Sequence, residues 1–256
     1  MAEQSQPSHL SRILTHPDVI RDPQSFFDVY QAPIRKFFAC LCNDGNEADE
    51  QFQEFALKFL SGAFDKFNPD KGRFRDYLKA SLRNQVRRRY QKQSAEPDVV
   101  SEEILELAED SRAIQPIDSA MEMFDAAEGE QIRQLVEAEM RDEESRGRNQ
   151  FHSLLQFAID FQVQQSEKSD QQGTRKVPVS AVIDFISEKF GETVSRDAAK
   201  QRMSRAKADF ASKMITEIGT RIGETSLTAI AQSASELGLS AFVSSEIARR
   251  LEKAQK

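Results

Sequence analysis

Apolar residues recur along most of this chain at intervals of three and four positions, which places them on one face of an α-helix. A first helix is predicted over residues 23–42 and a second over residues 47–65, both rich in phenylalanine on the apolar face. A turn-forming run, residues 43–46, separates them. A third helix follows the loop at residues 67–72 and keeps its apolar face through Tyr90. Alternating patterns typical of strands are almost absent, so the sequence predicts an all-α protein whose first three helices share one core.

The second half of the chain predicts a pair of helices joined by a short turn. Helical patterning from residue 131 is followed by a polar gap, residues 164–176. After Pro178 comes a short apolar helix that Gly191 is placed to end, and Ser195 is placed to cap a longer basic helix. A short helix, a tight turn and a basic second helix are typical of the helix-turn-helix motif. Other helical hairpins share this pattern, so the motif alone leaves that alternative open.

These patterns divide the chain into two helical domains and their connections. The first domain precedes an acidic linker, and the second contains the helix-turn-helix. The predicted parts are a loose N-terminal segment at 1–22, a first domain at 23–93, an acidic linker at 94–130, a second domain at 131–223 and a C-terminal helical extension at 224–256.

Composition excludes several classes of protein. With 256 residues, the chain has room for roughly two domains. No apolar run approaches the ~20 residues that span a bilayer, and the N-terminus lacks the pattern of a signal peptide. Cys40 and Cys42 are too few for a disulfide framework and fit a reducing cytoplasm. The three histidines show no ligand spacing, so we expect no metal site and no cofactor. No nucleophile–base pair or phosphate-binding loop is found, and we expect no enzymatic activity.

The third predicted helix carries the strongest charge pattern. Residues 71–92 hold nine basic residues against one acid, Asp76, in a protein whose formal net charge is −7. Because acids at i,i+4 are missing, a solvated charged face explains the segment less well than a localised site for a polyanion. One face of the helix would pack on the core while cations project from another face at four-residue steps. The projecting cations are Arg75, Lys79, Arg83 and Arg87.

The segment that follows has the opposite charge. Residues 93–144 contain 17 acidic residues and three arginines. One interpretation is a solvated linker. Another is an acidic segment that competes with DNA for basic channels elsewhere or shields the basic helices of its own chain.

Two stretches of the chain, one within residues 48–84 and one at residues 194–206, carry motifs that are similar to those of a known family. Residues 48–55 are similar to the family's A-E-D-L-x-Q-E-F, and residues 72–84 carry GRFRxxLxxSLxN, which resembles variants from Planctomycetes-like genomes. Residues 194–206 are similar to I-S-x-x-A-V-K-x-R-L-H-R-x-R. The chain thus resembles the extracytoplasmic-function type of bacterial sigma-70 factors. The two stretches stand in that family's order, and together the resemblance covers about half of the chain.

The resemblance implies a subunit that gives RNA polymerase its promoter specificity. The second helix would dock on the largest polymerase subunit, and the implied contacts are Asp49, Glu50, Gln53 and Glu54. The loop and basic helix would engage the −10 element and hold the separated strand, through Asn68, Lys71, Arg73, Arg75, Lys79, Arg83, Asn84, Arg87 and Arg88. The acidic linker would pass through the polymerase toward its active-site channel.

The second domain would read the −35 element in duplex DNA and touch the flap of the other large subunit. Base edges in the major groove are read by Arg, Lys, Gln and Ser side chains, and the candidates are Arg196, Lys200, Gln201 and Ser204. Arg205 and Lys207 are expected to contact phosphates, which position without specifying. An anti-sigma factor is a further possible partner, and no membrane contact is expected.

The chain departs from the family pattern in four places. Tyr77 replaces the usual Trp, and Gln51 replaces the Leu of the A-E-D-L string. The Leu-Pro-x-x-x-Arg start of the second DNA-binding domain is missing at residues 151–163, and the polar insertion at 164–176 follows. Two other functions stay open: a helix-turn-helix regulator that never joins the polymerase, and an interaction protein that sequesters another factor.

Overall fold

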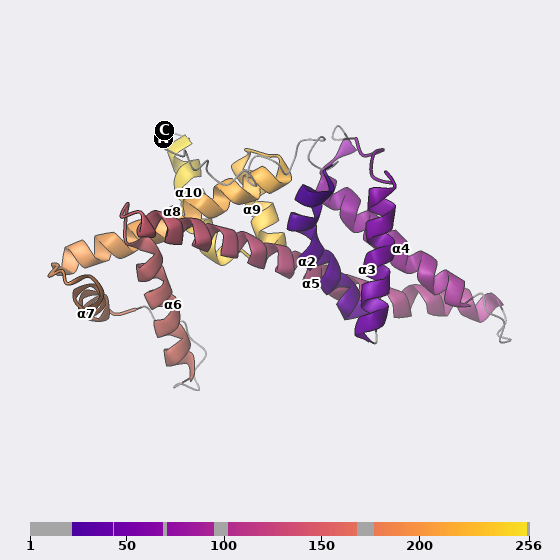
Figure 1. Ribbon diagram of the computed structural model, residues 1–256, viewed down its shortest axis with the longest axis horizontal. Helices are drawn as coiled ribbons and strands as arrows, with labels where there is room; N and C mark the ends of the chain where they lie inside the picture. Colours follow the sequence, from indigo (N-terminus) through magenta and orange to yellow (C-terminus); the bar gives the residue numbers. More distant parts are fainter. Residues whose placement is uncertain (1–21, 43, 69–70, 95–101, 168–176, 255–256) are drawn as a thin grey trace, which may run out of the picture. The chain divides into compact units, whose positions relative to one another are not determined.

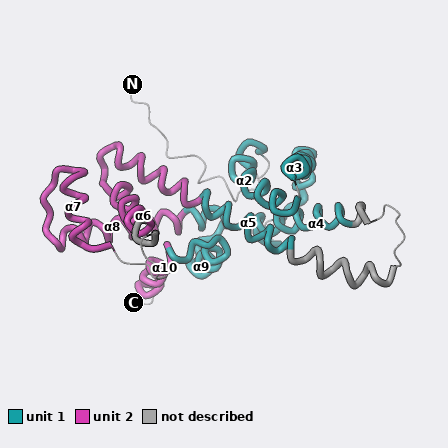
Figure 2. Tube along the Cα trace, turned by 90° about the horizontal axis from the view of Figure 1, so that it is seen from below, with its two compact units in different colours: residues 1–131, 217–241 teal, residues 132–216, 242–256 magenta. Residues whose placement is uncertain are grey.

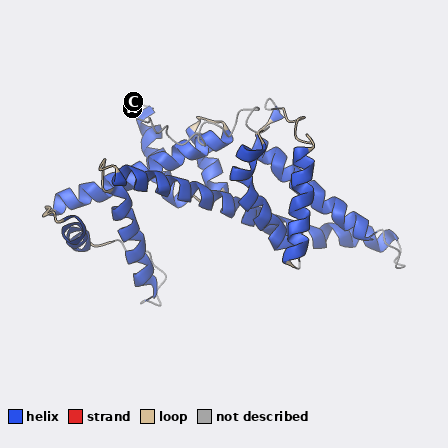
Figure 3. Cartoon of the chain, viewed as in Figure 1, coloured by secondary structure: helices blue, strands red, loops and turns tan. Residues whose placement is uncertain are grey.

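The computed structural model describes residues 22–42, 44–68, 71–94, 102–167 and 177–254. All regular elements among them are helices (Figures 1 and 3), so the predicted all-α class is confirmed. The predicted loose segment at 1–22 lies almost wholly outside the described residues. The chain forms two compact units (Figure 2). Unit 1 comprises residues 1–131 and 217–241, and unit 2 comprises residues 132–216 and 242–256.

Unit 1 begins with the two phenylalanine-rich helices that the sequence predicts, α2 (Pro23–Leu41) and α3 (Gly45–Leu60). The Asp22 carboxylate accepts hydrogen bonds from the Ser25 hydroxyl and backbone N–H, and these bonds lower the pKa of Asp22. They satisfy an amide that the first turn of a helix leaves unpaired. Helix α3 ends before the predicted residue 65, because residues 61–66 form turns in which Gly62 has a φ of 79°.

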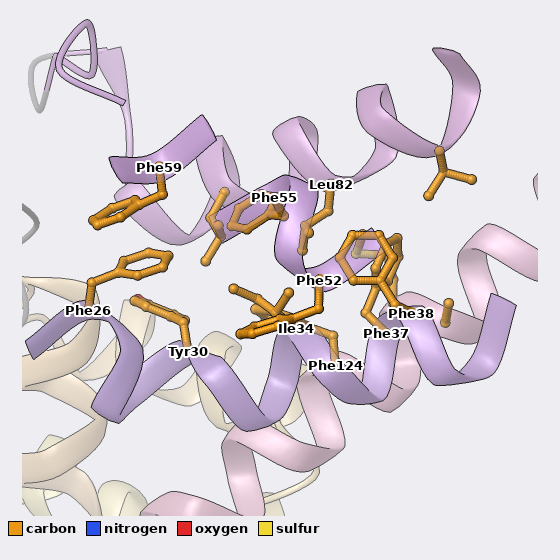
Figure 4. Close-up of a cluster of buried hydrophobic side chains, with 14 of the residues drawn as sticks. Phe26, Tyr30, Ile34, Phe37, Phe38, Phe52, Phe55, Phe59, Leu82 and Phe124 are labelled. Carbon is orange, nitrogen blue, oxygen red and sulfur yellow. The ribbon is translucent and has the colours of Figure 1, made fainter. Parts of the chain in front are cut away.

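Stacked aromatic rings hold α2 and α3 together with α4 (Phe74–Ser94). The rings of Phe26 and Phe59 stack with centroids 3.8 Å apart, and Figure 4 shows them facing each other. Phe74 meets Phe26 edge-on at 6.1 Å. Each such side chain contributes about 1.5–3 kcal/mol by leaving water. This shared aromatic core fixes which face of α3 and of α4 remains outside.

Helix α5 (Glu102–Ser145) contains most of the acidic segment. It adds four buried apolar side chains to the core of α2, α3 and α4, namely Ile117, Ala120, Met121 and Phe124. The sequence predicts a linker over residues 94–130, and the structure differs there. The four side chains fall at i, i+3, i+4 and i+7, which gives α5 a helical buried face despite its many acids.

The chain returns to unit 1 near its C-terminus. The end of α8 (Arg196–Ile222) and α9 (Leu227–Glu236) belong to this unit. Their buried apolar residues include Ile218, Ile222, Ile230 and Ala234. The predicted extension at 224–256 is therefore divided, because residues 224–241 belong to unit 1 and the rest to unit 2.

Unit 2 contains α6 (Phe151–Glu167), α7 (Val179–Phe190), most of α8, and α10 (Ser240–Ala254). Phe157 of α6 stacks on Phe185 of α7 with centroids 4.4 Å apart. Leu154, Ile186 and Ala199 are fully buried in the same core. This packing holds α7 and the start of α8 together as the sequence predicts.

Close backbone contact in unit 1 gives a prediction about Gly129. A Cβ at this position would lie 2.2 Å from the carbonyl oxygen of Leu237. An Ala in a helix interior normally stabilises by about 1 kcal/mol over Gly, but Gly129→Ala should instead destabilise by roughly 2 kcal/mol. Chemical denaturation measures the change. Gly45→Ala is the control, because a Cβ there would have no atom within 4 Å. An equally stable Gly129→Ala protein would contradict the described contact.

Candidate nucleic-acid interface

Arg75, in the first turn of α4, is buried with only 2% of its side chain exposed. Its Nε donates to Glu128 at 2.8 Å, its Nη1 to Glu236 at 2.8 Å and its Nη2 to Asp125 at 2.6 Å. Two of these carboxylates come from α5 and one from α9. Each guanidinium nitrogen therefore has its own acceptor.

The carboxylates keep Arg75 charged despite its burial. Burial by itself would lower the pKa of Arg75, but Glu128 and then Asp125 outweigh it and raise that pKa. Glu128 is 1% exposed and lies 4.0 Å from a second buried guanidinium, that of Arg221. Burial, and next the charge of Glu128, raises the pKa of Tyr30. Breaking such a pair by removing one partner costs about 3–5 kcal/mol, because the other charge stays buried.

The other cations in the first half of α4 also have acidic partners. The Nζ of Lys79 lies 2.8 Å from a carboxylate oxygen of Asp125. Arg73, just before α4, donates from Nε to Asp76 at 2.8 Å and from Nη1 to the hydroxyl of Ser233 at 3.1 Å. The structure thus corrects the predicted outward projection of Arg75 and Lys79. Their partners lie about 50 residues or more along the chain, beyond the reach of an i,i+4 argument.

The second half of α4 has a different charge environment. Arg87 and Arg88 are exposed and Arg83 is half-buried. The described part of the chain shows no ion pair for any of these three. Asn84 is exposed, as are Asn68 and Lys71 of the loop before the helix. The structure therefore brings the solvated cations together on the C-terminal half of α4.

Helix α3 presents the residues that the sequence predicts as polymerase contacts. The side chains of Asp49, Glu50, Gln53 and Glu54 are all exposed. Leu57 and Leu60 of the same helix are 67% and 58% exposed. The sequence pattern predicts Leu60 on the apolar face of this helix, and the structure corrects that prediction. The sequence does carry a signal for Leu57, because this apolar residue lies outside the apolar face formed by the phenylalanines of α3. The outer face of α3 is thus acidic with an apolar end.

In unit 2, α7 and α8 have the caps that the sequence predicts. Gly191 ends α7 with a φ of 67°, and the Ser195 hydroxyl accepts a hydrogen bond from the backbone N–H of Ala198 at 3.2 Å. The predicted readers are all exposed on α8, namely Arg196, Lys200, Gln201, Ser204, Arg205 and Lys207. Lys200 lies 3.6 Å from Asp197, a loose pair on an exposed surface.

Next to this surface, Arg202 joins α8 to the turn after α7. Its Nη2 lies 2.6 Å from the Glu192 carboxylate. Hydrogen bonds from Arg202 and then from Gln150 lower the pKa of Glu192. Gln150, Glu192 and Arg202, together with Arg205, line an open pocket of about 580 Å³ in unit 2. The pair fixes the start of α8 against the preceding turn.

Residues 26–96, which contain the aromatic core of α2 and α3 and all the cations of α4, match the family model for Sigma-70 region 2. This part of the chain is similar to sigma-70 region 2. We call residues 26–96 the region 2 domain. The chain has no significant match to a curated protein or to a solved structure. The match supports a sigma-factor role in transcription initiation, within a family of transcription proteins rather than enzymes.

The match leaves the partners of the buried cations outside its span. Asp125, Glu128 and Glu236 all follow residue 96, where the region 2 domain ends. Among the described residues, no helix is long and apolar enough to cross a membrane. The same residues contain no group of three or more His, Cys, Asp or Glu side chains that could hold a metal ion.

The two halves of α4 should respond differently to loss of a cation. Arg75→Leu leaves Glu128 buried without its main partner, so unfolding should become easier by about 3–5 kcal/mol, and Tm should fall by roughly 6 °C or more. Arg87→Ala removes one cation from the same helix at an exposed position and should change stability by less than about 0.5 kcal/mol. Thermal unfolding followed by circular dichroism compares the two. Equal Tm values for both variants would overturn the division of α4 into a structural and a solvated half.

Proposed function

We propose that this protein is a sigma factor that binds core RNA polymerase, recognises the −10 and −35 promoter elements and promotes initiation of DNA-templated transcription. One observation carries the proposal. Arg75 and Lys79, in the first half of α4, pair with acids of α5 and α9, and Arg89 near its end pairs with Glu47 of α3. Arg83, Arg87 and Arg88 have no ion pair within the described residues and form the solvated group of this helix. The extracytoplasmic-function type and the Planctomycetes-like variant stay predictions from the sequence.

The −10 surface that we propose consists of the solvated half of α4 and the loop before it. Its members are Asn68, Lys71, Arg73, Arg83, Asn84, Arg87 and Arg88. We leave out Arg75 and Lys79, because their side chains are only 2% and 14% exposed, whereas Arg73 is paired with an acid but remains 27% exposed. Unstacking a base costs a few kcal/mol, while each captured base returns about 1–3 kcal/mol. Phosphate contacts from this surface and contacts to the polymerase together would have to hold the open strand.

The polymerase contact that we propose is the outer face of α3. Its carboxylates, Asp49, Glu50 and Glu54, would meet basic side chains of the largest subunit. Leu57 and Leu60 would lose their water in the complex, and burying a Leu side chain contributes about 1.5–3 kcal/mol. Charge would guide the docking of this face, and the two leucines would supply much of its affinity.

The −35 surface that we propose is the exposed face of α8. Arg196, Lys200, Gln201 and Ser204 would read base edges, and Arg205 and Lys207 would contact phosphates. Unit 2 would also meet the flap of the second large subunit. We expect the protein to act in the cytoplasm, where the polymerase is, and an anti-sigma factor would compete for the α3 face.

The α3 face gives the first test of this function. The double variant Leu57→Ser/Leu60→Ser should bind core RNA polymerase at least about tenfold more weakly, the equivalent of 1.4 kcal/mol. Co-purification with core enzyme at graded concentrations measures the loss. The control is Met123→Ser, because Met123 is 45% exposed on α5, outside the proposed contact. If purified wild-type protein neither binds core enzyme nor changes its promoter choice, the proposed function is wrong.

The two DNA surfaces should differ in what they contribute. Arg87→Ala/Arg88→Ala should weaken binding of the holoenzyme to all promoters and reduce the salt slope of log K by about 0.9 per lost phosphate contact. Lys200→Ala or Gln201→Ala should instead change the preference among −35 sequences. Run-off transcription on a library of genomic fragments, at several salt concentrations, separates these effects. A uniform loss of affinity in both sets would refute the division of roles.

A further inference from the structure

Helix α9 lies against the start of α4, although about 160 residues separate the paired side chains in the sequence. The hydroxyl of Ser233, 1% exposed, accepts a hydrogen bond from Arg73 at 3.1 Å. The carboxylate of Glu236 lies 2.8 Å from Nη1 of Arg75 and 3.9 Å from Nη2 of Arg73. One helix from the C-terminal part of the chain thus contacts two consecutive cations of the region 2 domain.

This contact belongs to a tightly built part of unit 1. Ile230, Ala234, Leu237 and Leu239 are each less than 5% exposed. Two glycines inside helices allow the close approach. A Cβ at Gly129 would clash with the Leu237 carbonyl, and one at Gly219 would lie 2.9 Å from the carbonyl oxygen of Glu224. Packing therefore sets the position of α9 relative to α5 and the end of α8, and the contacts of Ser233 and Glu236 with Arg73 and Arg75 join α9 to the start of α4.

Arg73 is the residue of the proposed −10 surface that contacts Ser233 of α9. It stands between the loop with Asn68 and Lys71 and the first turn of α4, and 27% of its side chain is exposed. The carboxylate of Asp76 accepts hydrogen bonds from its Nε and Nη2, and the hydroxyl of Ser233 accepts one from its Nη1. The guanidinium is held on two sides, so its direction depends on α9 as well as on α4.

Glu236 connects this surface to the buried charges. Arg75 has one acceptor for each nitrogen, and without the Glu236 carboxylate its Nη1 would be buried with no anionic acceptor. A buried donor that loses its partner is costly, so the first turn of α4 would shift to recover a hydrogen bond. Arg73 and the loop before α4 would move with it.

We propose that α9 is a positioning element of the −10 surface, in which Ser233 and Glu236 hold the start of α4 and the side chain of Arg73 in the orientation that captures the DNA strand. The proposal rests on the function proposed above. It gives the C-terminal segment at residues 217–241 a role in promoter opening. In this view the DNA-binding surface depends on residues far beyond the region 2 match.

The test uses full-length protein assembled with core RNA polymerase. Its probe is a fork-junction DNA from a promoter selected in the run-off assay. Glu236→Gln should weaken binding of this DNA by about fivefold to tenfold, because the acceptor of Nη1 loses its charge and a charge-assisted hydrogen bond is roughly twice as strong as one to a neutral group. Glu236→Asp should restore part of the affinity. The control Glu252→Gln removes the same charge from an exposed position of α10 and should leave the affinity unchanged.

A second measurement separates positioning from general destabilisation. Core binding through the α3 face should stay at the wild-type value in Glu236→Gln, because the described ion pairs of Glu236 are with Arg73 and Arg75, while those of the α3 face are with Arg35 and Lys58. In an Arg73→Ala background, Glu236→Gln should have less than half of its effect, since the side chain that it positions is gone.

Each other outcome overturns the inference. If Glu236→Gln binds the fork DNA as tightly as the wild type, α9 does not position the −10 surface. If it binds more tightly, α9 masks that surface. If core binding falls in parallel with DNA binding, the role is only structural. If wild-type protein fails to bind core enzyme at all, the proposed function and this inference fall together.

Discussion

The buried guanidinium of Arg75 is the constraint on which the arrangement of unit 1 depends. A charge taken out of water must be surrounded by groups that replace its hydration. Among the described residues, the carboxylates that accept hydrogen bonds from Arg75 all lie outside the region 2 match. The acceptors come from α5 and α9, at Asp125, Glu128 and Glu236. Both helices must therefore be in place before α4 can bury its first turn. Unit 1 consequently joins an N-terminal stretch with a segment near the C-terminus.

The same constraint explains where the solvated cations lie. Carboxylates of α5 and α9 neutralise the first half of α4, so the second half retains Arg83, Arg87 and Arg88 for a polyanion. A stripe of cations along the whole helix would bind any DNA strongly and without regard to sequence. Confining the solvated charges to about two helical turns lowers that unspecific affinity. Contacts from the polymerase would then decide where the protein binds.

The sequence predicts the helices more reliably than the environment of their charged residues. Phenylalanines at i, i+3 and i+4 locate α2 and α3, and Gly191 and Ser195 locate the turn between α7 and α8. The burial of Arg75 could not be predicted, because its partners are distant in the sequence. The local spacing of residues around Arg75 gives no information about them. The helix in the acidic segment was detectable from Ile117 to Phe124, but the density of acids outweighed these few apolar positions. Leu57 is an apolar residue off the buried face, a signal that points to a contact surface. Leu60 follows the apolar pattern of the phenylalanines, and its exposure could be found only from the structure.

The acids of α5 take on a specific meaning once their partners are known. From net charge alone, the segment is interpreted as a solvated linker or as a general competitor for DNA. Asp125 and Glu128 instead contact particular cations of α4, at distances below 3 Å. This matches the second interpretation of the acidic segment, in which it shields the chain's own basic helix. The shielding is also selective, because it stops before Arg83. An acidic protein can therefore carry a cationic surface whose extent is set by internal ion pairs, and α5 and α9 fix where that surface begins.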